Sequence, residues 1–371
     1  FTLIKSITFY SIIFFYIKIF FKKKILKREN YILAESFLIL NLNNKENFNQ
    51  NILKLKNENI FLVLNFLPQK KIFLLLKVLH EIHKTNFIFK ENYLTFKDYI
   101  YSLLHYVRKK KFIYRYKRFN KWDVSPIINN EIKSNKNFYS AITGILNFRF
   151  FKNLSKEHIS LKKTINLFEN NAVGRGWNLG SRTFFPKVEN LGYQGYINFS
   201  QFMNSHPCRF EEKAKILPNK IAVISKFFKK NKKEFYSKTK VLLAPSLNFK
   251  IDKRKIKKIN NNTTTLILTG IKDIDQKLIN WSLKFIKVNK KIKLKIKFHP
   301  ILPKESFDLK IINNFNTRID VSNEDLSLLL NKSHSIISTG PTTAIYEAFL
   351  KKCYVIIPVF DPWDKLNLEN C

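Results

Sequence analysis

The chain has 371 residues, 45% of them hydrophobic and 15% aromatic, with 67 lysines and arginines against 27 acidic residues and a net charge of +40. This apolar content excludes a wholly disordered chain, and three widely spaced cysteines exclude a disulfide-stapled scaffold. No cysteine–histidine cluster has the spacing of a zinc site, and the composition fits a reducing, cytoplasmic setting. The length predicts about two domains.

The basic excess consists almost entirely of lysine, with 57 lysines and 10 arginines. Asparagine, isoleucine and phenylalanine are also over-used, while glycine (8) and methionine (1) are scarce, which is typical of a sequence drifting under A+T-rich coding. We interpret most lysines as solvated surface and expect anionic partners: phosphates, nucleotides or anionic lipid surfaces, with no nucleic acid among them. A dedicated polyanion-binding surface is the alternative.

Both ends of the sequence suggest a fragment. The chain starts at Phe1, contains Met203 as its only methionine, and stops at Cys371 shortly after a strand-like segment. Residues 7–21 are apolar, but Lys18 interrupts them, and only 12 apolar or neutral residues lie between Lys5 and Lys18. A membrane span needs about 20 such residues, so this segment predicts a buried strand or helix, or an interfacial segment.

The first 165 residues contain few catalytic residue types. The pattern predicts a strand at 60–66, an amphipathic helix at 71–84 and a basic helix at 99–116. Glycines then cluster, five of the eight lying between Gly174 and Gly195. In such a glycine-poor chain, this clustering predicts backbone conformations or close approaches that other residues cannot supply. Strand-like runs follow at 220–225 and 240–244.

A polar, charged segment at 251–263 predicts a hinge between an N-terminal domain, 1–250, and a C-terminal domain, 264–371. The C-terminal domain alternates regularly. Strands are predicted at 264–269, 292–298, 318–321, 335–338 and 354–359, and helices at 273–288, 323–331 (with Ser322 or Asn323 as N-cap) and 344–351. Apolar strands alternating with helices indicate a doubly wound parallel sheet, which binds ligands at the carboxyl ends of its strands.

One of those strand ends is followed by hydroxyl residues. The run from Ser338 to Thr343 reads STGPTT, where a strand ends, a glycine turns the chain and a helix begins. The free N–H groups of a first helical turn attract phosphate, and Thr342 and Thr343 add hydroxyls. The alternative is an ordinary helix cap. Glu347, one turn into that helix, is predicted to contact a ribose hydroxyl or to be a solvated or structurally paired glutamate.

A histidine follows the neighbouring strand. His299 precedes Pro300 and opens onto the same edge of the predicted sheet. A histidine there can donate to a nucleotide phosphate as the leaving group gains charge. Lys297, two residues earlier, is predicted to point the same way. The alternative is a lone histidine at a strand end.

The third candidate is the run Glu169–Trp177, ENNAVGRGW. We interpret Gly174-Arg175-Gly176 as a turn, with Glu169 as a general base and Arg175 binding an anionic substrate group. The alternative is a tight turn packed by Trp177. Glu211 and Glu212 belong to no recognisable motif, and no Walker or dinucleotide fingerprint occurs.

These segments resemble a known family. The strand–helix order with the run Lys297–Pro300 (KFHP) and the STGPTT run resembles the nucleotide-binding half of GT-B glycosyltransferases. In carrying an HP motif and a Ser/Thr motif, the chain is similar to bacterial capsule and O-antigen enzymes. These include sialyltransferase-like and Kdo-transferase-like enzymes, which use CMP-activated sugars. The GRGW block and the run Gly192–Gly195 (GYQG) resemble bacterial surface-carbohydrate biosynthesis proteins, so the resemblance covers about half of the chain, residues 166–360.

The resemblance implies a GT-B-like α/β fold, with two Rossmann-like doubly wound domains facing across a cleft. It implies a glycosyltransferase that moves a sugar from a nucleotide donor to a glycan or lipid-linked glycan, without metal or other cofactor, in the cytoplasm or peripherally at the inner face of the plasma membrane. Glu169 and His299 would be catalytic, and Arg175 and Gln194 would bind substrate. The donor nucleotide and its phosphates would contact Lys297, Ser338, Thr339, Gly340, Thr342, Thr343 and Glu347.

Other classes stay open at this point. Transferases that move glycerol phosphate or ribitol phosphate from a CDP donor also carry a His-Pro motif and a Ser/Thr turn. A basic nucleic-acid-binding protein and an inactive transferase fragment are further alternatives. A glycerol phosphate or ribitol phosphate transferase would make a phosphodiester instead of a glycosidic linkage. A nucleic-acid-binding protein would bind with a steep salt dependence.

Overall fold

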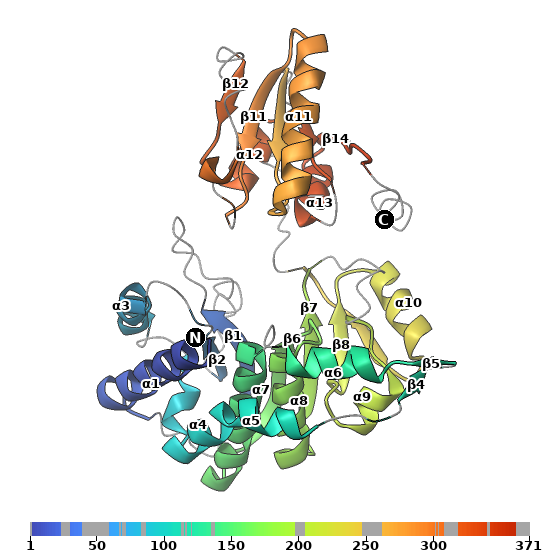
Figure 1. Ribbon diagram of the computed structural model, residues 1–371. Coiled ribbons are helices and arrows are strands. Elements are labelled where there is room, and N and C mark those ends of the chain that lie inside the picture. Colours follow the sequence, from blue (N-terminus) through green and yellow to red (C-terminus); the bar gives the residue numbers. More distant parts are fainter. Residues whose placement is uncertain are drawn as a thin grey trace. The chain divides into compact units, whose positions relative to one another are not determined.

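The structure is a computed structural model of the chain, and it describes residues 2–23, 30–38, 59–66, 68, 72–82, 87–112, 115, 117–119, 121–134, 138–196, 205–246, 262–300, 302, 304–307, 318–339 and 342–360. The chain divides into two compact units (Figure 1). Unit 1 comprises Phe1–Gly195 and Met203–Pro245, and unit 2 comprises Tyr196–Phe202 and Ser246–Cys371. Residues 251–261 of the predicted hinge lie outside the described residues.

Unit 1 is built on a parallel sheet of seven strands, in the order β3-β2-β1-β6-β7-β8-β9. Parallel neighbours require long crossovers, and helices supply most of these connections. The strands are β1 (Tyr31–Leu38), β2 (Ile60–Phe66), β3 (Phe87–Ile88), β6 (Leu161–Leu167), β7 (Glu189–Gln194), β8 (Lys220–Val223) and β9 (Lys240–Leu243). The predicted strand at 60–66 is confirmed as β2.

The described helices of unit 1 include the amphipathic one predicted at 71–84, which is α3. The apolar segment near the start forms a helix, α1, and the segment predicted as one basic helix at 99–116 contains two short helices and a 3-10 turn. The helices are α1 (Thr2–Phe20), α3 (Ile72–Ile82), α4 (Phe96–Leu103), α5 (His105–Arg108), α6 (Ser125–Lys133), α7 (Phe138–Leu154), α8 (Ala172–Phe184), α9 (Arg209–Lys213) and α10 (Lys226–Phe235). A small antiparallel hairpin joins β4 (Arg118–Phe119) to β5 (Trp122–Asp123), and 3-10 turns span Lys90–Asn92, Lys109–Lys111 and Ser155–Glu157.

The glycine cluster lies largely in and after α8. The prediction of a turn at Gly174–Gly176 is wrong, because Asn171 caps a helix that begins at Ala172 and its Oδ1 accepts from the Gly174 N–H at 3.0 Å. A Cβ on Gly176 would stand 2.0 Å from the backbone oxygen of Gly144 in α7. The glycines therefore allow α7 and α8 to touch backbone to backbone, which confirms the predicted close approach.

Unit 2 is a parallel five-stranded sheet in the order β12-β11-β10-β13-β14, with α11, α12 and α13 in the connections between its strands. This confirms the predicted doubly wound sheet. Its strands are β10 (Thr263–Ile267), β11 (Lys293–Lys297), β12 (Ile319–Val321), β13 (Ser335–Ile337) and β14 (Tyr354–Ile356); its helices are α11 (Lys272–Val288), α12 (Leu326–Asn331), α13 (Thr343–Leu350) and a 3-10 turn at Lys304–Ser306. Helix α12 starts later than predicted, because Asp325 and not Ser322 or Asn323 caps it, accepting from the Ser327 N–H at 2.8 Å.

Alternate strand residues of unit 2 point to opposite faces of the sheet. In β10, Leu266 joins the core beside α11, while Ile267 joins the core with Ala344 and Ala348 of α13. Strand β10 is therefore covered on both sides, which explains its continuous apolar run, whereas β11 alternates buried Leu294 and Ile296 with lysines.

The order of strands reverses between β1 and β6 in unit 1 and between β10 and β13 in unit 2. Connections leave in opposite directions at such a point, so a crevice opens outside the carboxyl ends of the two strands. In unit 2 the described residues there are 268–270 after β10 and 338–339 after β13; in unit 1 they are 168–171 after β6. These positions contain several of the predicted site residues.

Candidate functional site

The imidazole of His299 lies directly over Gly270. Gly270 has a φ of +89°, and a Cβ at this position would stand 2.7 Å from His299 Nδ1. Only glycine fits both the backbone conformation and the ring. His299 is partly buried, and burial lowers its pKa while the nearby Asp275 carboxylate opposes that shift. The end of β10 and His299, two residues after β11, thus meet at one edge of the sheet.

Asp275 fixes the loop that carries Gly270. It is completely buried in the first turn of α11. One of its carboxylate oxygens accepts from Thr269 N–H at 2.6 Å and Thr269 Oγ1 at 2.8 Å, and the other accepts from Gly270 N–H at 2.8 Å. Sequence reasoning missed Asp275. The available signal was an acidic residue in the first turn of a helix that follows a strand and a glycine.

Ser338 and Thr339 lie at the predicted strand end, and both side chains are fully buried. Ser338 Oγ donates to the Ile267 carbonyl at 2.9 Å, and Thr339 Oγ1 donates to the Pro358 carbonyl at 3.1 Å. These hydroxyls tie β13 to β10 and to the segment after β14. They support the turn from inside instead of presenting hydroxyls to solvent. Gly340 and Pro341 lie outside the described residues.

Helix α13 begins where phosphate binding was predicted. Thr342 is its N-cap, with Oγ1 accepting from Ala344 N–H at 3.3 Å, and Thr343 is exposed in the first turn. The remaining N–H groups of this turn have no partner within the helix itself, as at any helix start. An exposed hydroxyl beside them makes this the part of the predicted Ser/Thr motif that is accessible to an anion.

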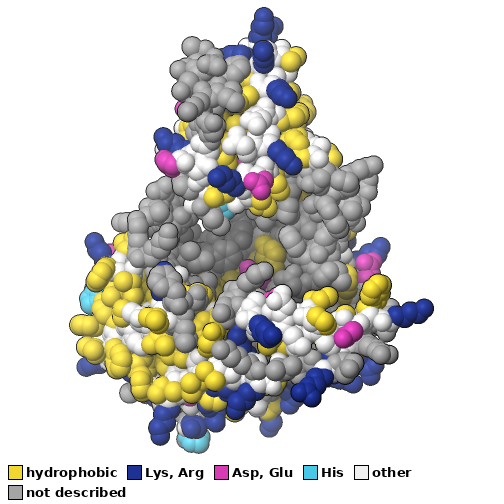
Figure 2. Space-filling view, in the orientation of Figure 1, with side chains coloured by type: hydrophobic (Ala, Val, Ile, Leu, Met, Phe, Trp, Pro, Cys, Tyr) yellow, Lys and Arg dark blue, Asp and Glu magenta, His cyan; other side chains and the backbone are white. Residues whose placement is uncertain are grey.

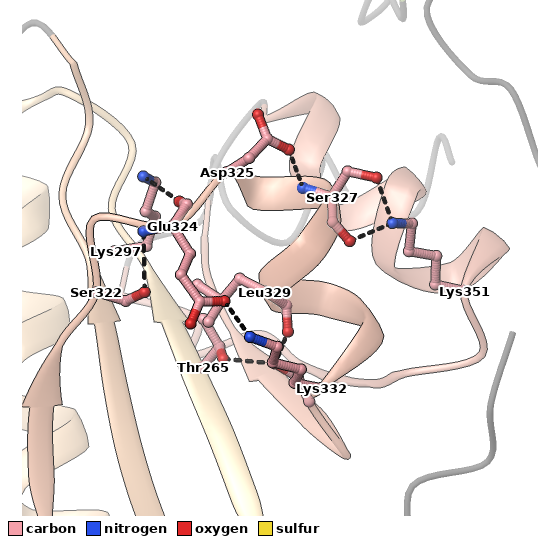
Figure 3. A network of polar contacts seen from close by, with 10 residues as sticks. Thr265, Lys297, Ser322, Glu324, Asp325, Ser327, Leu329, Lys332 and Lys351 are labelled. Atoms are coloured by element: carbon pink, nitrogen blue, oxygen red, sulfur yellow. Dashed lines mark hydrogen bonds and ion pairs between the residues drawn. The ribbon is translucent and has the colours of Figure 1, made fainter. Parts of the chain in front are cut away.

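Glu347 lies on the α12 side of α13. It is partly buried, its Oε1 stands 3.8 Å from Lys351 Nζ, and it shares a hydrogen bond with Ser327 in α12. Burial raises the pKa of this carboxyl above its usual value. Lys351 also donates to the backbone and hydroxyl oxygens of Ser327 (Figure 3). Glu347 is therefore already engaged in joining α13 to α12.

Lys297 has a partner of its own. Its ammonium donates to the carbonyl oxygen of Glu324 at 2.6 Å, just ahead of α12 (Figure 3). The Glu324 carboxylate pairs at 2.8 Å with Lys332, the C-cap of the same helix, and this pairing lowers the pKa of the Glu324 carboxyl. Lys297 thus ties the end of β11 to the loop that starts α12.

In unit 1, Glu169 follows β6 at the strand-order reversal. Its side chain is exposed, and Oε2 accepts from Asn171 Nδ2 at 3.0 Å. The next residue, Asn170, is buried and has a left-handed φ of +52°. This conformation turns the chain between the strand and α8, and it leaves the Glu169 carboxylate at the carboxyl edge of the sheet.

A cluster around Glu211 holds that turn in place. Its Oε1 accepts from Asn170 Nδ2 at 2.9 Å and Arg175 Nη2 at 2.5 Å, and its Oε2 accepts from Cys208 N–H at 3.1 Å. Arg175 also donates to Asn170 Oδ1 at 3.3 Å. The guanidinium predicted to bind substrate is thus engaged with Glu211, a residue that the sequence did not single out. Glu211 holds Arg175 and Asn170 because the fold brings α9 next to α8.

Gln194 ends β7 and is fully buried. Neither its amide oxygen nor its amide nitrogen has a hydrogen-bond partner among the described residues. Of the residues described above, the structure brings together His299, Gly270 and Asp275 in unit 2, where α13 begins at the same edge of the sheet, and it groups Arg175 and Glu211 around the loop of Glu169 in unit 1. Within the described parts of the chain, no three His, Cys, Asp or Glu side chains are grouped as a metal site would require.

Sequence comparison finds no matching protein-family model and no matching curated protein. Solved structures do match. The glycotransferase of kitacinnamycin aligns over 93% of this chain and 84% of its own length, with a TM-score of 0.50 and 8% identity. Arabidopsis thaliana UGT89C1 complexed with UDP aligns over 92% and 83%, with a TM-score of 0.50 and 10% identity.

Identities this low establish the fold alone. The chain has a GT-B-like α/β fold with one parallel, Rossmann-like sheet in each unit, as the sequence resemblance implied.

Proposed function

We propose that the chain is a nucleotide-sugar-dependent glycosyltransferase, with the donor nucleotide bound at the carboxyl edge of the unit 2 sheet. The main observation behind this proposal is the packing of the His299 ring on Gly270, at the edge of the unit 2 sheet where α13 also begins. Of the solved structures that share the fold, one is named as a glycotransferase, and UGT89C1 is complexed with UDP. A nucleoside diphosphate or monophosphate is the ligand class that suits such an edge.

In this proposal, the first-turn N–H groups of α13 and the Thr342 and Thr343 hydroxyls hold the donor phosphate. His299 donates to the departing phosphate as its charge grows. Glu169 removes the proton of the acceptor hydroxyl, and Glu211 and Arg175 keep its loop in position. The glycosidic bond forms between the acceptor oxygen and the sugar, and the nucleotide leaves with the bonding electron pair.

In this proposal, the other predicted site residues have supporting roles. Ser338, Thr339 and Lys297 support the donor edge through their bonds to backbone carbonyls. Glu347 would contact the ribose only by exchanging its bonds to Lys351 and Ser327. The proposed donor site uses these protein groups without a metal.

The finer proposal concerns the substrates. From the sequence resemblance, we propose a CMP-activated acidic sugar as donor and a glycan or lipid-linked glycan as acceptor in cell-surface polysaccharide or lipopolysaccharide synthesis. Gln194, at the end of β7, would contribute to binding the substrate. The chain would work in the cytoplasm, peripherally at the inner face of the plasma membrane.

The test is a thermal-shift series with CMP, CDP, UDP and GDP on the wild type, His299→Ala and the matched variant His334→Ala, whose histidine is exposed elsewhere in unit 2. A ligand that binds only the folded chain raises its stability by mass action. We expect one nucleotide class to stabilise the wild type and His334→Ala, and to stabilise His299→Ala less. Equal shifts in all three proteins would remove His299 from the site.

Turnover with the selected nucleotide sugar then tests the chemistry. Loss of a positioned proton donor is expected to lower kcat by about 10²–10⁴-fold in His299→Ala. A phosphodiester product in place of a glycosidic one would instead identify a glycerol phosphate or ribitol phosphate transferase. Salt-sensitive binding to RNA or DNA without any nucleotide effect would point to the nucleic-acid alternative.

A further inference from the structure

Helix α1 is apolar on two opposite sides. Phe9, Ile13 and Ile17 are 0–5% exposed and pack into the core of unit 1. On the other side, Ile4, Phe15 and Ile19 are 68%, 51% and 71% exposed. A helix that is apolar all round normally has a second apolar environment, because exposed side chains of this size are costly in water.

The exposed side of α1 continues onto α4. The rings of Phe15 and Phe96 lie 6.2 Å apart, and a groove of about 270 Å³ runs between the helices, with Ile7 on one wall and Ile100 on the other. We call this the α1–α4 surface, formed by Ile4, Ile7, Phe15, Ile19, Phe96 and Ile100, each at least 41% exposed. Figure 2 shows hydrophobic side chains gathered over this part of unit 1.

The exposed charges on α1 and α4 have one sign. Lys5, Lys18 and Lys97 are exposed on α1 and α4, whereas α1 carries no acidic residue. The acidic residue of α4, Asp98, is 6% exposed and bonded to Thr95 at the helix cap. An apolar stripe with lysines at its edges matches a partner that has an apolar interior and anionic groups at its surface.

We propose that the α1–α4 surface docks unit 1 onto an anionic lipid bilayer, with α1 lying in the plane of the interface. The nineteen residues of α1 extend about 28 Å at 1.5 Å per residue, so the stripe contacts lipid along its whole length. Its apolar side chains enter the acyl boundary, and the stems of Lys5 and Lys97 extend outward to place their ammonium groups among the anionic headgroups, while Lys18 keeps its bond to the Asn92 carbonyl at 3.1 Å.

Charge argues against a second copy of the chain as the occupant. A symmetric contact through this surface would bring Lys5, Lys18 and Lys97 toward the same residues of the other copy, with no exposed carboxylate on α1 or α4 to pair with them.

The described helices include none long and apolar enough to cross a membrane. The docking proposal is independent of the reaction proposed for unit 2.

The test is co-sedimentation of the full chain with vesicles of phosphatidylcholine alone and with phosphatidylglycerol added. The apolar variant is Ile4→Gln/Phe15→Gln/Ile19→Gln. Its matched control is Ile127→Gln/Phe227→Gln/Val288→Gln, which removes side chains that are 71%, 46% and 81% exposed elsewhere. The apolar variant and its control both keep the net charge of the wild type, so the attraction of the overall +40 charge to anionic vesicles is the same in the two proteins.

We expect the wild type and the control to bind anionic vesicles, and the apolar variant to bind at least about tenfold more weakly. Lys5→Gln/Lys97→Gln should weaken binding at least about fivefold relative to Lys230→Gln/Lys272→Gln, which removes the same charge from other helices. Thermal unfolding of each variant verifies folding.

Three results would overturn the proposal. The first is the absence of vesicle binding by the wild type. The second is equal binding by the apolar variant and its control, which would assign binding to overall charge. The third is equal binding to neutral and anionic vesicles. A wild-type dimer that the apolar variant loses in sedimentation equilibrium, without vesicle binding, would make the surface an interface between copies.

Discussion

Gly270 combines two constraints that are usually met at separate residues. Its φ of +89° lies in a region that side chains rarely adopt, and the His299 ring occupies the space of a Cβ. Gly270→Ala is therefore expected to lower the free energy of unfolding by about 1–3 kcal/mol, measured by urea denaturation. The same substitution in a His299→Ala background should cost less, because only the backbone strain remains. Equal losses in both backgrounds would contradict the close approach.

Lys232 in α10 is 1% exposed, and its ammonium donates to the Ser205 carbonyl at 2.7 Å without an ion pair among the described residues. Burial lowers its pKa from 10.5 to about 7. Between these pH values, the unfolded chain holds a proton that the folded chain has released, so this residue makes stability rise from about pH 7 to 10.5. Lys232→Met should remove that rise in a series of Tm measurements, whereas exposed Lys233→Met should retain it.

At the scale of elements, the contact between α7 and α8 depends on glycine. A Cβ on Gly176 would meet backbone at 2.0 Å, whereas a Cβ on Gly174 would come closest to the Asn166 side-chain nitrogen, at 2.9 Å, and would stand 3.5 Å from the nearest backbone atom. Gly176→Ala should force the helices apart and cost about 1–3 kcal/mol. Gly174→Ala should cost less, because a side chain can move and alanine favours the helix by about 1 kcal/mol. Chemical denaturation of both variants tests this, and equal costs would contradict it.

The loop after β6 provides a second test at this scale. Glu211 and Glu212 of α9 each pair with an arginine of α8, Glu211 with Arg175 and Glu212 with Arg182. Only Glu211 also bonds Asn170, next to Glu169. If Glu169 is the base, Glu211→Ala should lower kcat by about 10–100-fold through misplacement, with Glu212→Ala near wild type. Similar kcat values for the two variants would show that the cluster only stabilises the fold.

At the scale of the whole molecule, the charge of +40 is the dominant feature. Like charges repel more in the folded chain than in the expanded one, and salt screens them over about 10 Å at 0.1 M. Raising sodium chloride from about 0.02 to 0.5 M should therefore raise Tm, measured by calorimetry, since the Debye length falls steeply over this range. A Tm that falls over this range would mean that specific ion pairs outweigh the repulsion.

The amino-acid sequence determined the elements of unit 2 and the edge at which its predicted ligand residues gather. Short apolar runs alternating with amphipathic segments can be buried only as a parallel sheet covered by helices, and this pattern is local. The glycine cluster likewise predicted close approaches, because a glycine-poor chain has little other reason to retain five glycines within 22 residues.

Only the tertiary structure decided what those residues contact. Ser338 and Thr339 face inward to carbonyls of neighbouring strands, Arg175 binds the Glu211 carboxylate, and Asp275 folds back onto the loop before its own helix. Most of these bonds join residues far apart in sequence, so no local pattern records them. The exposed stripe on α1 follows the same rule, because a helix that is apolar on both sides shows its solvent-facing side only once the other has packed into the core.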